Sequence, residues 1–227
     1  MSDHAHAHVD AHGHSATSGH AYAHQFDSAE HQHSAAQLGM WVFIAQEILF
    51  FGGLFLTYTV YRFLYPAAFA QASHHLDVTL GCFNTAVLIG SSLTMALAVH
   101  GAQLGQRWTQ VIFLVLTIVL GCVFLGVKSI EYGHKFHEHL VPGPTFLFDG
   151  DSNHAQIFFS LYFVMTGLHA LHMIIGIAVL AVLVWQAWRG AYGTAYYSPI
   201  ELTGLYWHFV DIIWIFLFPL LYLIGRH

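Results

Sequence analysis

Near its C-terminus the chain places a histidine and an aspartate inside an apolar run from about residue 199 to 224. Such a run can cross a bilayer, because about 20 residues at a rise of ~1.5 Å each span the hydrocarbon core. His208 and Asp211 stand three residues apart, so they share one face of the expected helix. Ionisable groups at this depth are costly unless they pair or face protein. We expect this face to point into a helix bundle or toward a partner chain, with His208 paired to Asp211 or to the preceding span.

Other ionisable side chains also lie within or beside apolar runs. Glu47 is the deepest carboxylate, and Glu131 falls near an expected membrane edge with Lys128 three residues before it. His169 and His172 share a face of their helix by the same spacing rule. An ionisable residue inside a span is by default a candidate functional residue. The candidate set is Glu47, Glu131, His169, His172, His208 and Asp211.

Three kinds of chemistry compete for these residues. Haem b could be held by histidines on facing helices, with His100, His169, His172 and His208 available. A pair three residues apart cannot sandwich a haem, however, because both rings point from the same side. A proton or substrate path of a transporter could use Glu47, Glu131 and Asp211, although five spans offer no inverted repeat. In the third interpretation the polar groups pair internally, the bundle holds lipid, and it docks a partner subunit.

The composition defines the class of protein that positions these residues. Of 227 residues, 56% are hydrophobic and 8% are charged, against about a quarter charged in soluble domains. Six Lys and Arg residues are too few for a nucleic-acid surface. The two cysteines, Cys82 and Cys122, lie in apolar runs and form no C-x-x-C motif, which argues against a disulfide framework or a zinc site. We therefore predict an integral membrane protein.

The apolar pattern predicts an all-α bundle of five transmembrane helices, at about residues 38–65, 78–102, 109–140, 154–188 and 199–224. Residues 1–36 read as a separate, disordered tail with nine histidines, and residues 37–227 as the membrane domain. His4, His6 and His8 in the tail could bind Cu²⁺, Ni²⁺ or Zn²⁺. Arg107 and Arg189 fall on the side of the N-terminus and Arg62, Lys135 and Arg226 on the other, so the positive-inside rule leans slightly toward an outside N-terminus.

Several stretches resemble a known family. Residues 167–176 (GLHALHMIIG) and 206–218 (YWHFVDIIWIFLF) are similar to the two signature stretches of subunit III of haem–copper oxidases. Residues 46–51 (QEILFF) resemble the segment around that family's buried, carbodiimide-reactive glutamate. The stretches 84–88 (NTAVL) and 129–132 (SIEY) also match, in the family's order. The resemblance covers about residues 36–226 and fits the five-span bacterial form, which lacks the two helices that build one arm of the family's lipid-holding cleft.

The resemblance implies a non-catalytic subunit of a proton-pumping cytochrome c oxidase, with no redox centre in this chain. Haems and copper would lie in partner subunits, mainly subunit I, with subunit II and small subunits in the complex and phospholipid bound. Glu47 becomes the buried carboxylate that faces lipid or subunit I and relates to proton uptake. Glu131, His169, His172, His208 and Asp211 become structural residues of the inner bundle.

The resemblance also bears on location and on the electron donor. It implies a bacterial inner membrane with a cytoplasmic N-terminus, against the marginal charge count. Region 128–153 would then face the periplasm, where cytochrome c or another respiratory complex could dock. A quinol oxidase subunit III is the alternative, and an accessory protein of a nitric-oxide reductase is a further one. From a different class, a haem-b anchor or a proton-coupled transporter stays open.

Overall fold

The computed structural model describes residues 29–144, 146–148, 150–194 and 196–223, and every regular element within these ranges is a helix. Five described helices are long and apolar enough to cross a membrane. They are α1 (Ala29–Leu64), α3 (Val78–Gln103), α4 (Arg107–His137), α5 (Ser152–Trp188), and α6 (Ser198–Phe218) with its π-helical continuation η1 (Pro219–Leu223). The prediction of an all-α membrane protein with five spans is confirmed.

Polar residues and prolines set the helix ends. Asp77 precedes α3, and its carboxylate accepts hydrogen bonds from the backbone N–H groups of Thr79 at 2.8 Å and Leu80 at 3.3 Å. Asp151 caps α5 in the same way through the N–H of His154. The His154 imidazole lies 2.5 Å from the Asp151 carboxylate and holds the pKa of this aspartate below its usual value. Pro199 stands in the first turn of α6, where its missing N–H leaves no bond unmade.

Two elements differ from the predicted boundaries. Helix α1 begins at Ala29, so residues 29–36, predicted as disordered tail, are helical. The His33 ring bonds the Ser198 hydroxyl at 2.7 Å and ties this extension to the start of α6. The linker after α1 contains a short helix, α2 (Pro66–Ser73), whose Phe69 is buried against α5. His4, His6 and His8 lie outside the described residues.

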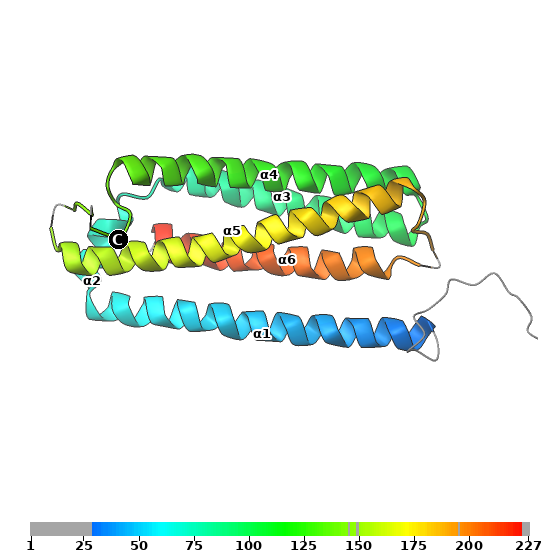
Figure 1. Cartoon of the computed structure of the whole chain (residues 1–227), viewed down its shortest axis with the longest axis horizontal. Coiled ribbons are helices and arrows are strands. Elements are labelled where there is room, and N and C mark those ends of the chain that lie inside the picture. The colour runs from blue at the N-terminus through cyan, green and yellow to red at the C-terminus, as the bar shows by residue number, and fades with distance from the viewer. Residues whose placement is uncertain (1–28, 145, 149, 195, 224–227) are drawn as a thin grey trace, which may run out of the picture.

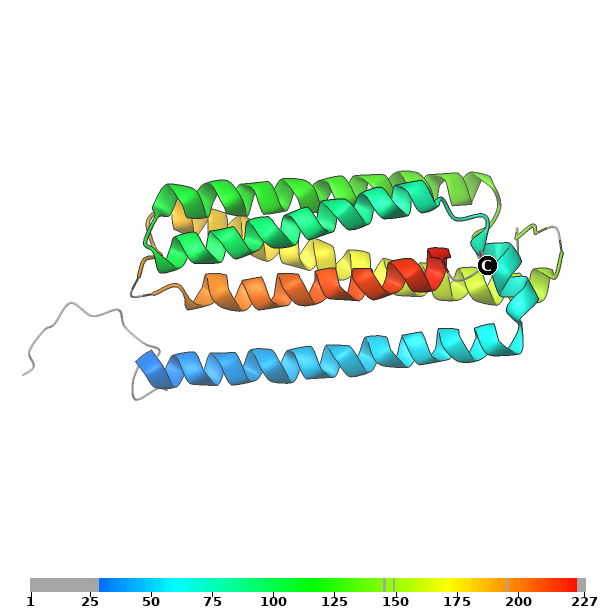
Figure 2. The same cartoon turned by 180° about the vertical axis from the view of Figure 1, so that it is seen from behind.

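Four of the long helices form a ring. Helices α3 and α5 each pack against both α4 and α6, and α1 lies along the outside against α6 and α5 (Figure 1). The opposite view brings α3, α6 and α1 to the front (Figure 2). The start of α1 shares one end of the molecule with the α3–α4 and α5–α6 connections, while α2, the α4–α5 loop and η1 lie at the other end (Figure 1). Ionisable residues of the ring therefore face α1, another ring helix or the membrane.

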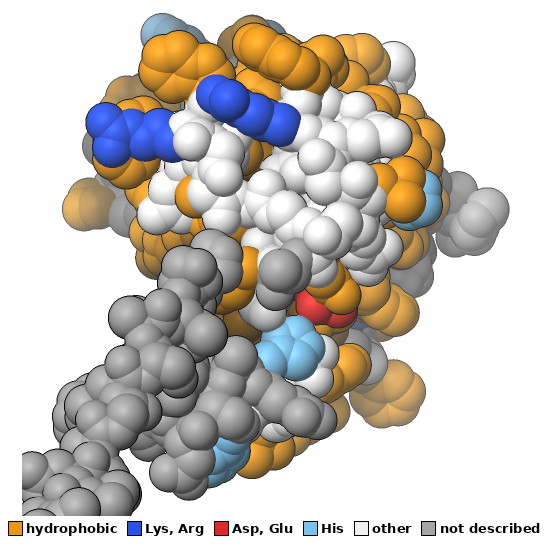
Figure 3. All heavy atoms as spheres, turned by 90° about the vertical axis from the view of Figure 1, so that its right-hand side faces the viewer, with side chains coloured by type: hydrophobic (Ala, Val, Ile, Leu, Met, Phe, Trp, Pro, Cys, Tyr) orange, Lys and Arg blue, Asp and Glu red, His pale blue; other side chains and the backbone are white. Residues whose placement is uncertain are grey.

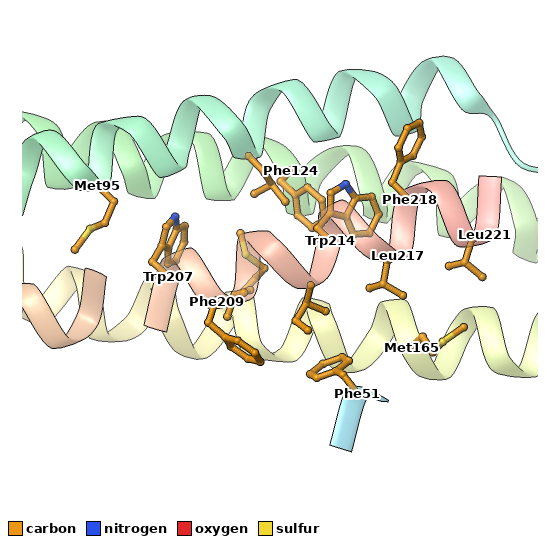
Figure 4. Close-up of a cluster of buried hydrophobic side chains, with 14 of the residues drawn as sticks. Phe51, Met95, Phe124, Met165, Trp207, Phe209, Trp214, Leu217, Phe218 and Leu221 are labelled. Carbon is orange, nitrogen blue, oxygen red and sulfur yellow. The ribbon is translucent and has the colours of Figure 1, made fainter. Parts of the chain in front are cut away.

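Aromatic side chains of α6 fill the centre of the ring. Trp207 and Trp214 are fully buried, and their indole N–H groups donate to Ser91 and Thr85 of α3 at 3.0 and 3.1 Å (Figure 4). Glycines make room for these rings. A Cβ at Gly176 of α5 would lie 2.8 Å from a ring carbon of Trp207, closer than any real Cβ contact. Small residues let membrane helices approach closely, and here they admit a large aromatic anchor.

Candidate functional site

The most complete polar cluster joins α4, α5 and η1 around Lys128. Its ammonium group donates to the carboxylate of Glu131 at 2.9 Å and to the hydroxyls of Tyr162 at 3.1 Å and Tyr222 at 2.9 Å. Both tyrosine hydroxyls in turn donate to the other oxygen of Glu131, at 2.8 and 2.5 Å. The side chains of Lys128 and Glu131 are only 5% and 3% exposed. A buried ion pair is tolerated when further hydrogen bonds satisfy both charges, as they do here.

Aromatic faces surround the same ammonium group. Four ring centroids lie 5.1–5.6 Å from its nitrogen, those of Tyr132, Tyr162, Trp214 and Tyr222. A cation over an aromatic face is attracted by the ring quadrupole, more strongly where water is excluded. Glu131, which the sequence placed near a membrane edge, is therefore a buried residue whose charge is matched from three helices. This arrangement holds α4, α5 and η1 together, and both Glu131 oxygens accept hydrogen bonds within it.

A second polar contact lies in the seam between α1 and α5. The Glu47 carboxyl and the His172 Nε2 atom are 3.3 Å apart. Glu47 is 8% exposed and its carboxyl reaches α5, while its expected place against lipid or subunit I stays a prediction. Tyr206 of α6 closes the seam by donating its hydroxyl to the His172 carbonyl at 2.9 Å. Helix α1, the least embedded of the five, is thus held by a polar contact at membrane depth.

A hydrogen bond fixes the tautomer of His172. The His172 Nδ1 atom lies 2.8 Å from the Leu168 carbonyl, and a carbonyl only accepts, so Nδ1 carries a hydrogen. Nε2 faces the Glu47 Oε2 atom at 3.3 Å, but this contact does not reach hydrogen-bonding geometry, and Oε2 has no hydrogen-bond partner among the described residues.

His169 occupies a different environment from His172. Its imidazole is fully buried between the rings of Phe124, at 5.4 Å, and Trp214, at 5.2 Å. Neither ring nitrogen has a hydrogen-bond partner among the described residues. The His169 ring points into the ring of helices, and the His172 ring points at α1. A step of three residues turns an α-helix by about 300°, so the two side chains stand about 60° apart around the helix axis and reach different neighbours.

The predicted His208–Asp211 pair does not form. The His208 Nδ1 atom instead bonds the Ser92 hydroxyl of α3 at 2.6 Å. Asp211 is 2% exposed, and although Ser92 lies beside it, neither of its oxygens has a hydrogen-bond partner of good geometry within the described part of the chain. Sharing a helix face did not bring the two residues into bonding geometry, and the hydrogen-bond partner of His208 comes from the neighbouring helix α3.

Of the six predicted residues, the structure brings only Glu47 and His172 into direct contact with each other. Beyond Lys128, which the sequence analysis noted beside Glu131, the partners that the sequence prediction missed are Tyr162, Tyr206, Tyr222 and Ser92. Lys128 had a signal, because an acidic residue follows three positions later in an apolar run. The others come from distant spans, and no local spacing marks them. No three His, Cys, Asp or Glu side chains gather as a metal site in the described ranges.

The fold and the buried polar groups define the class of protein. It is a multi-pass α-helical membrane protein with ionisable side chains buried between its helices. The chain belongs to the family described as cytochrome c oxidase subunit III, whose model matches residues 20–226. The prediction of a terminal-oxidase subunit III is confirmed, and membership implies partner oxidase subunits.

Individual relatives carry two kinds of name. The chain is 34% identical over 189 residues to quinol oxidase subunit 3 of Bacillus spizizenii, covering 83% of this chain and 86% of the relative. It is 32% identical over 194 residues to cytochrome c oxidase subunit 3 of Corynebacterium diphtheriae, covering 82% and 87%. It is 31% identical over 195 residues to cytochrome c oxidase subunit 3 of Thermostichus vulcanus, covering 83% and 87%.

Proposed function

We propose that this chain is a non-catalytic subunit of a proton-pumping haem–copper terminal oxidase of the bacterial plasma membrane. It packs mainly on subunit I, with subunit II and small subunits in the same complex, and the haems and copper belong to those partners. The complex reduces O₂ to water with electrons from cytochrome c. The observation that carries the proposal is the family match over residues 20–226.

The geometry fits a role in stabilising the complex rather than a role in the reaction itself. Lys128 and Glu131 satisfy each other through two tyrosines, and the Glu47 carboxyl lies 3.3 Å from the His172 ring. These contacts tie α1, α4, α5 and η1 together, which fits a subunit that stabilises its complex during turnover. A buried carboxyl in the apolar part of α1, that of Glu47, also fits a role in proton uptake. Phospholipid, which the resemblance implies as well, would cover apolar surface that no partner occupies.

We propose a cytoplasmic N-terminus. Basic side chains gather at the end of the molecule where α1 starts (Figure 3), and Arg107 and Arg189 belong to the two connections at that end. At the other end lie Arg62, in the last turn of α1, and Lys135, whose ammonium group pairs with Glu138 at 2.7 Å. The positive-inside rule counts basic residues and not net charge, so this near-even distribution does not set the orientation, and the proposal follows the family resemblance.

A mild-detergent purification through this chain tests the proposal. We expect a large polytopic partner, identified by mass spectrometry, and haem A-type absorbance in the preparation. A lone chain with its own haem b spectrum would replace the proposal by an electron-transferring anchor. A lone colourless chain would favour the alternative that this chain is a proton-coupled transporter.

The same preparation decides the electron donor. We expect reduced cytochrome c to support oxygen consumption, and a quinol to support none. The reverse result would make this chain the subunit III of a quinol oxidase, the activity named for the Bacillus spizizenii relative. Subunit III membership would stand in either case, because the donor site lies on another subunit.

A further inference from the structure

A groove runs between α3 and α6 on the face that Figure 2 brings forward. Its volume is about 260 Å³, and aliphatic side chains from both helices line it, among them Leu88, Ile212 and Ile215. Ser92, His208 and Asp211 also line this groove. An apolar groove with polar side chains in its wall differs from a plain lipid-facing surface.

Asp211 is the unsatisfied group in this groove. Its side chain is nearly fully buried, and both carboxyl oxygens are without a hydrogen-bond partner in the part of the chain that the structure describes. The nearby Ser92 hydroxyl is engaged with His208. An ionised carboxyl needs donors, and a protonated one needs an acceptor as well as a donor. A hydroxyl or carboxamide side chain meets either need, because it both donates and accepts.

The depth of Asp211 restricts what can supply that group. At ~1.5 Å per residue, Asp211 lies roughly 20 Å along the helix from Ser198 and roughly 18 Å from Leu223. It is therefore near the middle of a hydrocarbon core about 30 Å thick. Lipid headgroups stay at the interface, and acyl chains have no hydrogen-bonding group. A polar side chain on another transmembrane helix can reach this depth.

The neighbouring surface offers such a helix a place to pack. A second groove of about 480 Å³ lies between α1 and α6, lined by apolar residues such as Trp41, Ile48 and Phe209. It shares His208 and Ile212 with the first groove, so the two are continuous across α6. The outward side chains here are large and exposed, Ile212 at 49% and Ile215 at 45%.

We propose that the α3–α6 groove is where a transmembrane helix of a partner oxidase subunit docks, and that this helix presents a hydroxyl or carboxamide side chain to Asp211. The proposal rests on the proposed function, because it takes the partner from the oxidase complex. It adds the face of this chain that is used and the chemistry that the partner must present. Hydrogen bonds between side chains are an established means of association between membrane helices.

Photo-cross-linking in the intact complex tests the face. A benzophenone amino acid replaces Ile215 in the groove, and the matched control replaces Val119, which is 50% exposed on α4, the helix across the ring from α6. We expect a cross-link from position 215 to a polytopic oxidase subunit and only lipid or detergent adducts from position 119. Adducts of position 215 with lipid alone, or with a second copy of this chain, would overturn the proposal. Absence of every oxidase subunit from the wild-type preparation would instead overturn the proposed function.

Substitution of Asp211 tests the chemistry. Asp211→Leu removes the hydrogen-bonding group and Asp211→Asn keeps it. For Asp211→Leu we expect roughly tenfold weaker retention of the chain in the complex, the factor that 1.4 kcal/mol represents, whereas Asp211→Asn stays near wild type. The isolated Asp211→Leu chain should resist detergent unfolding at least as well as wild type, because an unsatisfied buried group is gone. Wild-type retention of Asp211→Leu, or loss of stability in the isolated chain with retention unchanged, contradicts the proposal.

Discussion

At Glu47 a single carboxyl of α1 contacts the His172 ring of α5 at 3.3 Å. Glu47→Ala should leave the haem content of the complex unchanged and reduce the number of turnovers before inactivation. The physical reason is that His172 loses its partner in a buried seam, at about 1–3 kcal/mol. Turnover number to inactivation, measured beside the optical spectrum, checks this.

Glu47→Gln serves as the control for the same seam. The carboxamide keeps the size and the hydrogen-bonding capacity of the side chain but cannot exchange a proton. Early inactivation in both variants would point to the proton, and early inactivation in Glu47→Ala alone would point to packing. Loss of haem signal in either variant would contradict a supporting role and make Glu47 an assembly residue.

Lys128 presents a sharper energetic test, because its partners are fully enclosed. Lys128→Met leaves the Glu131 carboxylate buried with two tyrosine hydroxyls and no cation. Breaking one side of a buried pair costs about 3–5 kcal/mol, whereas replacing both sides by apolar groups is often close to neutral. We expect Lys128→Met to unfold at a markedly lower concentration of denaturing detergent than wild type. The double variant Lys128→Met/Glu131→Leu should recover most of the lost stability. A double variant as unstable as the single one would show that the tyrosine hydroxyls, rather than the unpaired charge, dominate.

Residue-scale prediction from sequence succeeded where the signal was local. Glu47 and Glu131 stood out as carboxylates in apolar runs, and both are buried. The His208–Asp211 pairing failed, because helix spacing says which residues share a face and not which neighbouring helix offers a better partner. Tyr162 and Tyr222 could not be foreseen as partners of Lys128, since 34 and 94 residues separate them from it.

At the scale of elements, the close packing of α5 on α6 depends on Gly176. Its Cβ position meets the Trp207 ring at 2.8 Å and the Tyr206 ring at 3.1 Å. Gly176→Ala should therefore destabilise the bundle by about 1–3 kcal/mol, the usual range for overpacking. Gly167→Ala is the matched control on the same helix, because its nearest neighbour is the Tyr132 hydroxyl at 3.9 Å. Unfolding of the two variants in parallel checks this, and equal stability of both would mean that Trp207 can shift at little cost.

The boundaries of the long helices could be predicted from the sequence to within a few residues, with two exceptions. Spans stand out because a bilayer demands long apolar runs, and Asp77 marks the start of α3 as a capping residue. The extension of α1 to Ala29 was missed because residues 29–36 have no apolar periodicity, and a contact with Ser198 supports them. Helix α2 was missed because eight residues after a proline look like a linker until Phe69 finds its tertiary contact.

For the whole molecule, helix order and the end at which each connection lies follow from the chain alone, but the orientation in the membrane does not. Reversing the molecule changes no internal contact. Only the exposed charges at the two ends distinguish the orientations, and the sequence offers very few of them. Counting all basic residues slightly favoured an outside N-terminus. The pairing of Lys135 with Glu138 leaves this count as it was, because the rule weighs basic residues and not net charge, so the family resemblance decides the orientation.

We therefore predict that the N-terminal end lies in the cytoplasm, and thiol labelling tests it. In a chain with Cys82 and Cys122 replaced by alanine, a cysteine at Gln106 probes the α3–α4 connection and one at Asn153 probes the start of α5. Both positions are exposed and lie at opposite ends. A membrane-impermeant thiol reagent added to intact spheroplasts should label position 153, and position 106 only after the membrane is opened. Labelling of position 106 from outside would reverse the orientation and would contradict the topology that the family resemblance implies.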